Sequence, residues 1–323
     1  MEFFYIHLQD IALYGLLFAF TSLWIITINA RSNKKNKPKT APEPAGAWPF
    51  IGHLLLLKPD DLLYRKLGAM ADKYGPVFSM QLGAHRTLVI SSWQAAKECF
   101  TTHDRVFPTR PKCLAVKLMG YDHAMLGFAP YGPYWRDVRK LAMVELLSGR
   151  RLDMRKHVWD TEVDFFMKTL YEQWVGNGGR GPVLVEMKER LGDMAMNVVM
   201  RMMAGKRYFG NGACDEESRR CQKAMGGFMY LVGLPMVSDA MPFLGWLDAL
   251  KGYKREMERT GKEIDCVLGG WVEEHRLKKR LGGEVDESEQ DFIDVMLSVI
   301  DSGSFSGLDA DTVIKSTCLV SSL

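Results

Sequence analysis

Paired cysteines are missing from this sequence. Its six cysteines, at positions 99, 113, 214, 221, 266 and 318, are widely scattered, and no two of them form a CxxC pair. A disulfide framework or a cysteine-based zinc site normally shows closely and regularly spaced cysteines. The scatter therefore favours free thiols in a reducing compartment over disulfides.

The short motifs of several enzyme classes are also missing. There is no HExxH or HxxxH pair, no GxSxG and no P-loop, so zinc-enzyme, hydrolase and nucleotide-binding functions lack support. "GNGGRG" at residues 176–181 formally matches GxGxxG, but that fingerprint needs a strand before it and a helix after it. Here a helical pattern precedes it and "PVLVEM", which is typical of a strand, follows, so a surface loop is favoured. His123, in "GYDHAML", stands alone in a loop, where a histidine is usually structural.

The sequence also lacks an excess of positive charge outside one short segment. The chain carries 42 Lys and Arg against 39 Asp and Glu, and a cluster of cations lies in "RSNKKNKPK" at residues 31–39. Outside that cluster the chain is slightly acidic. A nucleic-acid partner therefore has no electrostatic support.

A long uncharged run is present near the start. "IALYGLLFAFTSLWIITI" spans residues 11–28 and continues to Ala30 before the first basic residue, Arg31. At about 1.5 Å of rise per residue, a helix of this length crosses a hydrocarbon core. The positive charge follows the run, which favours an uncleaved anchor over a signal peptide and places the body of the protein on the cytosolic side.

A proline-rich connector follows. "PKTAPEPAGAWPFIGHLLLL" contains Pro38, Pro42, Pro44 and Pro49, which exclude a helix continuing from the anchor. We interpret it as a stiff linker between bilayer and body.

The body is predicted to be mainly helical with a small sheet near its beginning. Apolar residues make up 47% of the chain, enough for a sizeable core. A helix in "LLYRKLGAMADKY" should stop at Gly75, and "VFSMQLGAHRTLVISS" predicts two strands joined by a turn. Further helices are expected at residues 134–147, 152–175, 187–203, about 216–230 and 247–279. Asp309 and Asp311 predict the start of a buried helix in "DADTVIKSTCLVSSL".

One helix has a face suited to a carboxylate. In "PYGPYWRDVRKLAMVELLS", Gly132 and Pro133 open the helix, and Trp135 and Arg139 lie four residues apart on one face. An indole N–H and a guanidinium fork are both donors. From the residues alone, an ordinary amphipathic helix is the simpler interpretation.

With its neighbours, that helix resembles a known family. The ordered stretches "PEPAGAWPFIGHL", "KYGPVFSMQLG", "CFTTHDRVFPTRP", "GFAPYGPYWRDVRK", "AGKRYF", "VSDAMPFLGWLD" and "DFIDVML" resemble a plant cytochrome P450 of the endoplasmic reticulum, a haem-thiolate monooxygenase. The resemblance is to the group that oxidises alkaloids, flavonoids and terpenoids. It implies the cytochrome P450 fold and three parts: an anchor (residues 1–30), a hinge (31–50) and a partial catalytic domain (51–323).

The resemblance implies roles for individual residues. Trp135 and Arg139 match the family's WxxxR pair, which contacts a haem propionate, and Arg110 in "FPTRP" enters the loop over the haem. The loop at residues 113–131 corresponds to the first substrate-recognition segment. Within it, Met125, Leu126 and Phe128 are candidates for lining the substrate pocket, with core packing as the alternative. The apolar stretch "FMYLVGLPMVSDAMPFLGW" would include a loop that dips toward the bilayer.

The sequence also departs from the family. None of the six cysteines stands in FxxGxRxCxG, the motif of the thiolate ligand, and the oxygen-activating acid–threonine motif is not found. Three ExxR matches, Glu216/Arg219, Glu256/Arg259 and Glu273/Arg276, have salt-bridge spacing and are interpreted as solvated helix faces. "DTVIKSTCL" resembles the beginning of the family's central helix, which predicts a fold truncated there.

Two functions stay open. In the first, this is the N-terminal portion of a monooxygenase that oxidises a lipophilic plant metabolite with O2 and electrons from NADPH–cytochrome P450 reductase, and that is inactive without the thiolate region. In the second, the chain is a non-catalytic, membrane-anchored protein that pairs with P450s or their reductase.

Overall fold

A computed structural model describes residues 14–15, 20–22, 24, 40–57, 62–210, 216–282, 286, 289–300 and 307–321. Most of the expected anchor (residues 1–30) and residues 31–39 of the expected hinge lie outside these residues. Within the described part, no single helix is both long and apolar enough to cross a membrane, and one bent pair of segments, Glu216–Ala240 with Pro242–Leu250, has sufficient length and apolar composition. The chain forms two compact units, Met1–Phe107 with Ala240–Pro242, and Pro108–Asp239 with Phe243–Leu323.

The first unit contains the expected small sheet. The 3-10 turn η1 (Leu54–Leu57) and helix α2 (Leu63–Tyr74) precede strands β1 (Val77–Leu82) and β2 (His85–Ile90), and helix α3 (Trp93–Thr101) follows. The strands are antiparallel, with Val77 opposite Ile90 and Leu82 opposite His85. Phe78 and Met80 of β1 are fully buried. As expected, α2 ends at Gly75, whose φ of 101° is a conformation that glycine adopts at little cost.

A histidine ties the proline-rich segment to this sheet. His53 Nε2 lies 2.8 Å from the main-chain oxygen of Pro44, and its Nδ1 accepts a hydrogen bond of 3.0 Å from the Gln81 amide in β1. Because both ring nitrogens of this buried side chain are engaged, the connector is fixed at Pro44.

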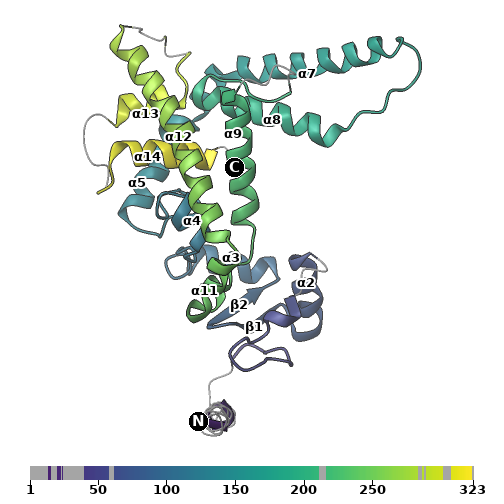
Figure 1. The fold of residues 1–323 in the computed structure, drawn as a ribbon, viewed down its shortest axis with the longest axis vertical. Coiled ribbons are helices and arrows are strands. Elements are labelled where there is room, and N and C mark those ends of the chain that lie inside the picture. The colour runs from purple at the N-terminus through teal and green to yellow at the C-terminus, as the bar shows by residue number, and fades with distance from the viewer. Residues whose placement is uncertain are drawn as a thin grey trace, which may run out of the picture. The chain divides into compact units, whose positions relative to one another are not determined.

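Every regular element among the described residues of the second unit is helical (Figure 1). Its elements in chain order are α4 (Leu114–Met119), α5 (Pro133–Leu141), the π-turn η2 (Ala142–Leu146), α6 (Gly149–Met154), α7 (Lys156–Gly176), α8 (Met187–Ala204), α9 (Glu216–Val232), α10 (Val237–Ala240), η3 (Pro242–Leu244), α11 (Trp246–Leu250), α12 (Tyr253–Arg280), α13 (Phe292–Val299) and α14 (Ala310–Ser321).

Helix α12 is the centre of the packing in this unit. It contacts α4, α9, α13 and α14, and its buried stripe includes Ile264, Leu268, Trp271 and Val272. Such a stripe is typical of an amphipathic helix that packs against a core. Helices α7 and α8 lie side by side as a second pair (Figure 1).

Several boundaries differ from the expectations. The stretch 247–279 is split into α11 and α12 at Gly252, which has a φ of 77°. Residues 182–186 in "PVLVEM" form no strand, and the glycines before them make a turn with positive φ at Gly178, Gly179 and Gly181. The loop expected at 113–131 begins with a helix, α4.

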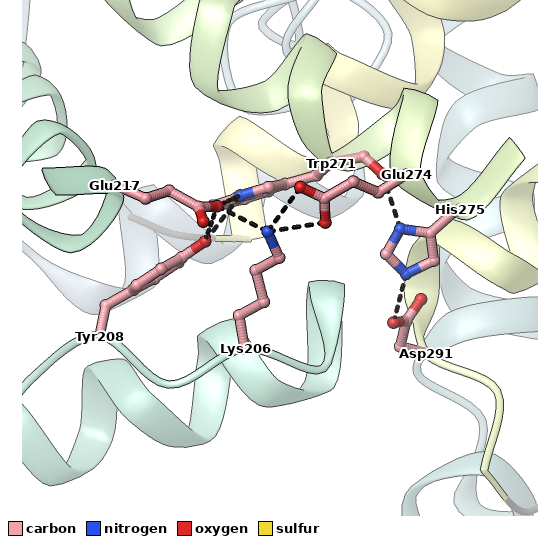
Figure 2. A network of polar contacts seen from close by, with 7 residues as sticks. All are labelled: Lys206, Tyr208, Glu217, Trp271, Glu274, His275 and Asp291. Carbon is pink, nitrogen blue, oxygen red and sulfur yellow. Dashed lines mark hydrogen bonds and ion pairs between the residues drawn. The ribbon is translucent and has the colours of Figure 1, made fainter. Parts of the chain in front are cut away.

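A polar network fixes α12 to the segment after α8 (Figure 2). Trp271 Nε1 donates to the Tyr208 hydroxyl at 2.9 Å, and that hydroxyl donates to the Glu217 carboxylate at 2.5 Å. Lys206 Nζ lies 2.6 Å from Glu217 and 2.7 Å from Glu274. Burial alone would lower the pKa of Lys206, but the two carboxylates outweigh it and raise the pKa. The network joins α9 and α12 through the "AGKRYF" stretch, and every group in it has a structural partner.

Candidate functional site

The expected carboxylate-binding face forms at the start of α5. Gly132 is the N-cap and Pro133 the first helical residue, a position where its missing N–H costs nothing. Trp135 and Arg139 lie one turn apart, with the Arg139 guanidinium carbon 5.1 Å from the indole centroid. The Tyr131 ring packs against the same indole at 5.4 Å. The cation–π contact favours a position of the guanidinium over the indole.

Both donors of this face are available to a ligand. Trp135 is half-buried and Arg139 is exposed, and among the described residues no carboxylate pairs with Arg139 and no acceptor bonds the Trp135 indole N–H. A guanidinium beside a free N–H is a good partner for a carboxylate. The donor set therefore fits a propionate group.

Arg110 has a different set of partners. Its Nη1 donates to the Pro108 oxygen at 2.8 Å and its Nε to the Gly127 oxygen at 3.3 Å. Gly127 stands between Leu126 and Phe128. Arg110 therefore braces the loop that carries the candidate pocket residues, while part of its guanidinium stays exposed.

The three candidate pocket residues lie at different depths. Met125 is fully buried and belongs to the hydrophobic core, whereas Leu126 and Phe128 are partly buried and pack against it. Met125 therefore contributes to core packing. Leu126 and Phe128 keep exposed area that a lipophilic ligand could cover.

Helix α5 is attached to this loop by Tyr134. Its hydroxyl donates to the main-chain oxygen of Ala124 at 2.7 Å, and burial raises the pKa of the phenol. Since Tyr134 adjoins Trp135, and Ala124 adjoins Met125, the carboxylate-binding face and the candidate pocket residues share one support.

The turn after α4 has an uncommon backbone. Tyr121, Asp122 and His123 have φ values of 53°, 50° and 69° in succession. The left-handed region costs a non-glycine residue about 1–2 kcal/mol, and three in a row are rarely found. Gly120 precedes them in a space too small for a side chain, because a Cβ there would lie 2.8 Å from Met125 Sδ.

Polar contacts hold this turn against α12. The Tyr121 hydroxyl donates to Asp265 Oδ1 at 3.2 Å, and Lys315 of α14 lies 2.8 Å from the same oxygen. Burial, and then the Asp265 charge, raise the pKa of Tyr121. The phenol is therefore neutral, and it acts as a donor.

Helix α14 is the buried helix that the sequence predicted. The Asp309 side chain accepts from the Thr312 amide at 2.8 Å, and Val313, Ile314 and Leu319 are fully buried. The expectation that Glu273/Arg276 is only a solvated face is wrong, because Arg276 also forms an ion pair with Asp311 of α14. Glu216/Arg219 is an exposed pair at 3.0 Å, as expected.

Three cysteines, the buried Cys221 and Cys318 and the half-buried Cys113, have raised pKa values. Burial raises the pKa of Cys221 to about 12 and also raises the pKa values of Cys113 and Cys318. These three side chains are therefore neutral thiols at neutral pH.

The sequence did not single out the residues that hold the site together. Tyr134 and Tyr121 act through hydroxyl groups whose partners lie 10 and 144 positions away, and nothing local reveals the second. For Tyr134, its place beside Trp135 was the available signal. His123 was noticed but interpreted as a structural loop histidine.

Comparison with known proteins gives a consistent result. The family model described as "Cytochrome P450" matches residues 42–319. The chain is 48% identical over 320 residues to a xanthotoxin 5-hydroxylase of Arabidopsis thaliana, covering 96% of this chain and 60% of that protein. It is 48% identical over 324 residues to a strychnine-10-hydroxylase of Strychnos nux-vomica, covering 99% of this chain and 61% of that one.

Two further comparisons concern length and fold. A cytochrome P450 of Panax ginseng is 59% identical over 246 residues, which cover 76% of this chain and all of that protein. A zebrafish cytochrome P450 structure with progesterone has a TM-score of 0.58 at 19% identity, covering 80% of this chain and 55% of that one, and so shares the fold. The chain spans about three-fifths of the length of the Arabidopsis and Strychnos relatives.

Proposed function

The chain belongs to the cytochrome P450 family, and we propose that it serves in a plant haem-thiolate monooxygenase that oxidises a lipophilic secondary metabolite. Relatives at 44–48% identity bear the names of a xanthotoxin hydroxylase, a strychnine hydroxylase, a flavonoid hydroxylase and a protopine monooxygenase. We extend their general activity to this chain, with NADPH–cytochrome P450 reductase as electron donor.

The observation that carries the proposal is the donor face of α5. Trp135 and Arg139 present an indole N–H and a guanidinium without carboxylate partners in the described part of the chain. We propose that they bind a haem propionate and so set the position of the macrocycle. When bound, haem supplies oxygen activation.

The same helix places the substrate loop. Through Tyr134 and Ala124, α5 is connected to Met125, Leu126 and Phe128, and Arg110 braces that loop at Gly127. We propose that Leu126 and Phe128 contact the substrate directly, that Met125 supports them from the core, and that Arg110 contributes to cofactor binding by holding the loop. The apolar character of this surface suits a lipophilic metabolite and excludes water.

The thiolate ligand is a separate requirement. None of the six cysteines stands in the family's ligand motif, and raised pKa values keep Cys221, Cys318 and the half-buried Cys113 as neutral thiols. We therefore expect the 323-residue chain to be inactive by itself and to need a region that supplies the thiolate.

The membrane assignment is also a proposal. The uncharged run at residues 11–28 and the basic cluster behind it support an anchor in the endoplasmic reticulum with the body facing the cytosol. Exposed apolar side chains at Met229, Phe243, Trp246 and Leu250 support a second contact with lipid.

The test is a reduced carbon-monoxide difference spectrum of two proteins in membranes, together with a product assay. The first is this chain, and the second joins its residues 1–319 to the remaining C-terminal part of the Arabidopsis relative. We expect a thiolate-type Soret band only in the chimera, and a product heavier by one oxygen atom when reductase and furanocoumarin or flavonoid substrates are supplied. A chimera that binds haem but oxidises none of them would contradict the proposed function, and a thiolate band from this chain alone would overturn the assignment of its cysteines.

A further inference from the structure

A charged groove runs between helices α9 and α12, which pack side by side (Figure 1). Its volume of about 590 Å³ is in the range of known ligand sites. Its floor contains the small side chains Ala224, Gly227 and Thr260. A Cβ added at Gly227 would lie 3.3 Å from Thr260 Cγ2 and 3.5 Å from Thr260 Oγ1, so the glycine keeps the floor open beside the threonine hydroxyl. None of the described residues that line the groove belongs to the donor face of α5 or to the loop at residues 113–131.

Thr260 places an unpartnered hydroxyl in this groove. The residue is only 8% exposed, and it is one of those that line the groove. A threonine inside a helix commonly donates to the carbonyl one turn earlier, as Thr161 and Thr317 do in this chain. Thr260 forms no such bond, and no other described residue is hydrogen-bonded to its hydroxyl. Because buried polar groups are nearly always paired, this donor indicates a molecule that enters the groove.

The walls of the groove carry an excess of positive charge. Four basic and three acidic side chains line it, which leaves one positive charge in excess. Arg219 and Arg220 of α9 are each paired with a glutamate of the groove, at 3.0 Å and 3.1 Å. Lys223 of α9 and Arg259 of α12 are the remaining two cations, and neither forms an ion pair with a described residue. One cation on each wall is therefore available to an anion.

These donors match a phosphate group better than a carboxylate. A phosphate monoester has three terminal oxygens that accept hydrogen bonds in different directions, whereas a carboxylate is planar and has two. Lys223, Arg259 and the Thr260 hydroxyl supply one donor group for each of the three oxygens. Glu256 of α12 also lines the groove without an ion-pair partner in the described part of the chain, and it can accept from hydroxyl groups of the same ligand.

We propose that the groove binds a phosphorylated polyol, with the phosphate on Lys223, Arg259 and Thr260 and the polyol hydroxyl groups facing Glu256. The groove is far larger than a phosphate ion, and so it admits a ring of the size of a sugar. The same chemistry occurs in soluble sugar phosphates and in the inositol head group of a lipid. The site does not rest on the proposed function, since it uses no residue assigned to haem or to the oxidised substrate.

The test measures the Kd of myo-inositol 1-phosphate by isothermal titration calorimetry on the full chain in phosphatidylcholine nanodiscs. We expect a Kd below about 1 mM, and weaker binding of both inorganic phosphate and myo-inositol. Lys223→Gln and Arg259→Gln should each raise the Kd about tenfold. Thr260→Val keeps the shape of the side chain but removes the donor, and should raise the Kd about three- to tenfold. Lys262→Gln is the matched control, because it removes an exposed cation of α12 that lines a different groove; it should leave the Kd unchanged.

Phosphorus NMR of the unmodified chain gives a result that does not depend on the folding of any variant. Two cations favour the dianion, so the second pKa of the bound phosphate should fall below its ordinary value of about 6. No binding of the soluble compound, an unshifted second pKa, or a loss in Lys262→Gln as large as in Lys223→Gln would each overturn the proposal.

Nanodiscs that also contain phosphatidylinositol distinguish the two sources of the ligand. A lipid head group in the groove would compete with myo-inositol 1-phosphate and raise its Kd, which would assign the site to the lipid. An unchanged Kd would assign it to a soluble phosphorylated polyol. Either result supports the groove as a site for this chemistry.

Discussion

The Tyr134 hydroxyl donates a 2.7 Å hydrogen bond to the main-chain oxygen of Ala124, and so connects the donor face of α5 to the loop with the pocket candidates. Tyr134→Phe removes the donor and leaves a largely buried carbonyl unpaired. We expect a loss of about 1 kcal/mol in the free energy of unfolding and faster amide exchange at residues 124–128. Denaturant titration and hydrogen–deuterium exchange measure the two effects.

The control is Tyr131→Phe, which deletes a hydroxyl that has no hydrogen bond in the described part of the chain. It should change neither quantity. If both variants loosen the loop equally, the Tyr134 bond does not hold it.

Arg139 should recognise the propionates of haem. We expect the purified chain to bind haem more tightly than haem dimethyl ester, because the ester lacks the carboxylates that a guanidinium pairs with. In Arg139→Gln the difference between haem and its ester should shrink by roughly tenfold in Kd, corresponding to about 1.4 kcal/mol, as followed by absorbance titration.

Arg136→Gln provides the comparison, since it removes an exposed guanidinium from the same helix at a position off the Trp135 face. It should keep the preference for free haem. Equal affinity of the unmodified chain for haem and the ester would show that α5 does not bind propionates.

The buried pair His275–Asp291 predicts a pH dependence of stability. His275 Nε2 lies 2.7 Å from Asp291 Oδ2, and its Nδ1 lies 2.7 Å from the Trp271 oxygen. Burial alone would lower the pKa of His275, but the Asp291 hydrogen bond and charge outweigh it, so the pKa is raised above its ordinary value of 6.5. The surrounding charges are Asp294 and Lys278, with Arg155 near Asp291.

A raised pKa in the folded state means that protonation stabilises the fold. The contribution of the His275–Asp291 pair to the free energy of unfolding is complete below pH 6.5. It is lost as the pH rises through the higher pKa of His275 in the folded state. The free energy of unfolding should therefore fall on the alkaline side, and His275→Gln should flatten that slope. An unchanged slope in the variant, in denaturant titrations from pH 6 to 9, would assign the effect to another group.

Glu217 predicts that the free energy of unfolding falls at acid pH. Burial alone would raise the pKa of its carboxyl, yet hydrogen bonds from Lys206 and Tyr208 hold it below the ordinary 4.5. The contribution of Glu217 to the free energy of unfolding is present above pH 4.5 and is lost as the pH falls through the lower pKa of the folded state. Glu217→Gln should cost about 1 kcal/mol at neutral pH, a modest value because the side chain is 44% exposed.

Glu216→Gln changes the adjacent residue, whose carboxylate forms only an exposed pair with Arg219. It should change the free energy of unfolding by less than about 0.5 kcal/mol. Similar losses in both variants would mean that the network around Tyr208 adds nothing beyond surface electrostatics.

Local signals predicted most of the fold. Gly75 ended α2 and the run around Ile264 and Trp271 formed a buried stripe, because glycine conformation and apolar period are encoded within a few residues. The Trp135/Arg139 face was visible for the same reason, since four-residue spacing on a helix fixes adjacency.

What the sequence could not predict depends on distant contacts. The turn from Tyr121 to His123 is stabilised by Asp265, which lies far away in the sequence. Arg276 looked like a solvated residue within its own helix, and only the packing of α14 brings Asp311 to it. Helix α4, of six residues, is too short for its period to be recognised.

Helix α4 also packs so closely on α12 that one glycine is required there. A Cβ added at Gly261 would lie 2.6 Å from the main-chain oxygen of Leu118, and backbone cannot move away as a side chain can. Gly261→Ala should therefore destabilise the protein by about 1–3 kcal/mol through overpacking. Because α4 leads into the turn at Tyr121, the displacement should also weaken the Tyr121–Asp265 bond.

Gly270→Ala is the matched change in the same helix, at an exposed position with open space around the Cβ. It should stabilise the helix by about 0.5–1 kcal/mol, because alanine loses less backbone entropy than glycine. Thermal unfolding of the two variants should shift in opposite directions, and a shift of the same sign in both would contradict the close contact between α4 and α12.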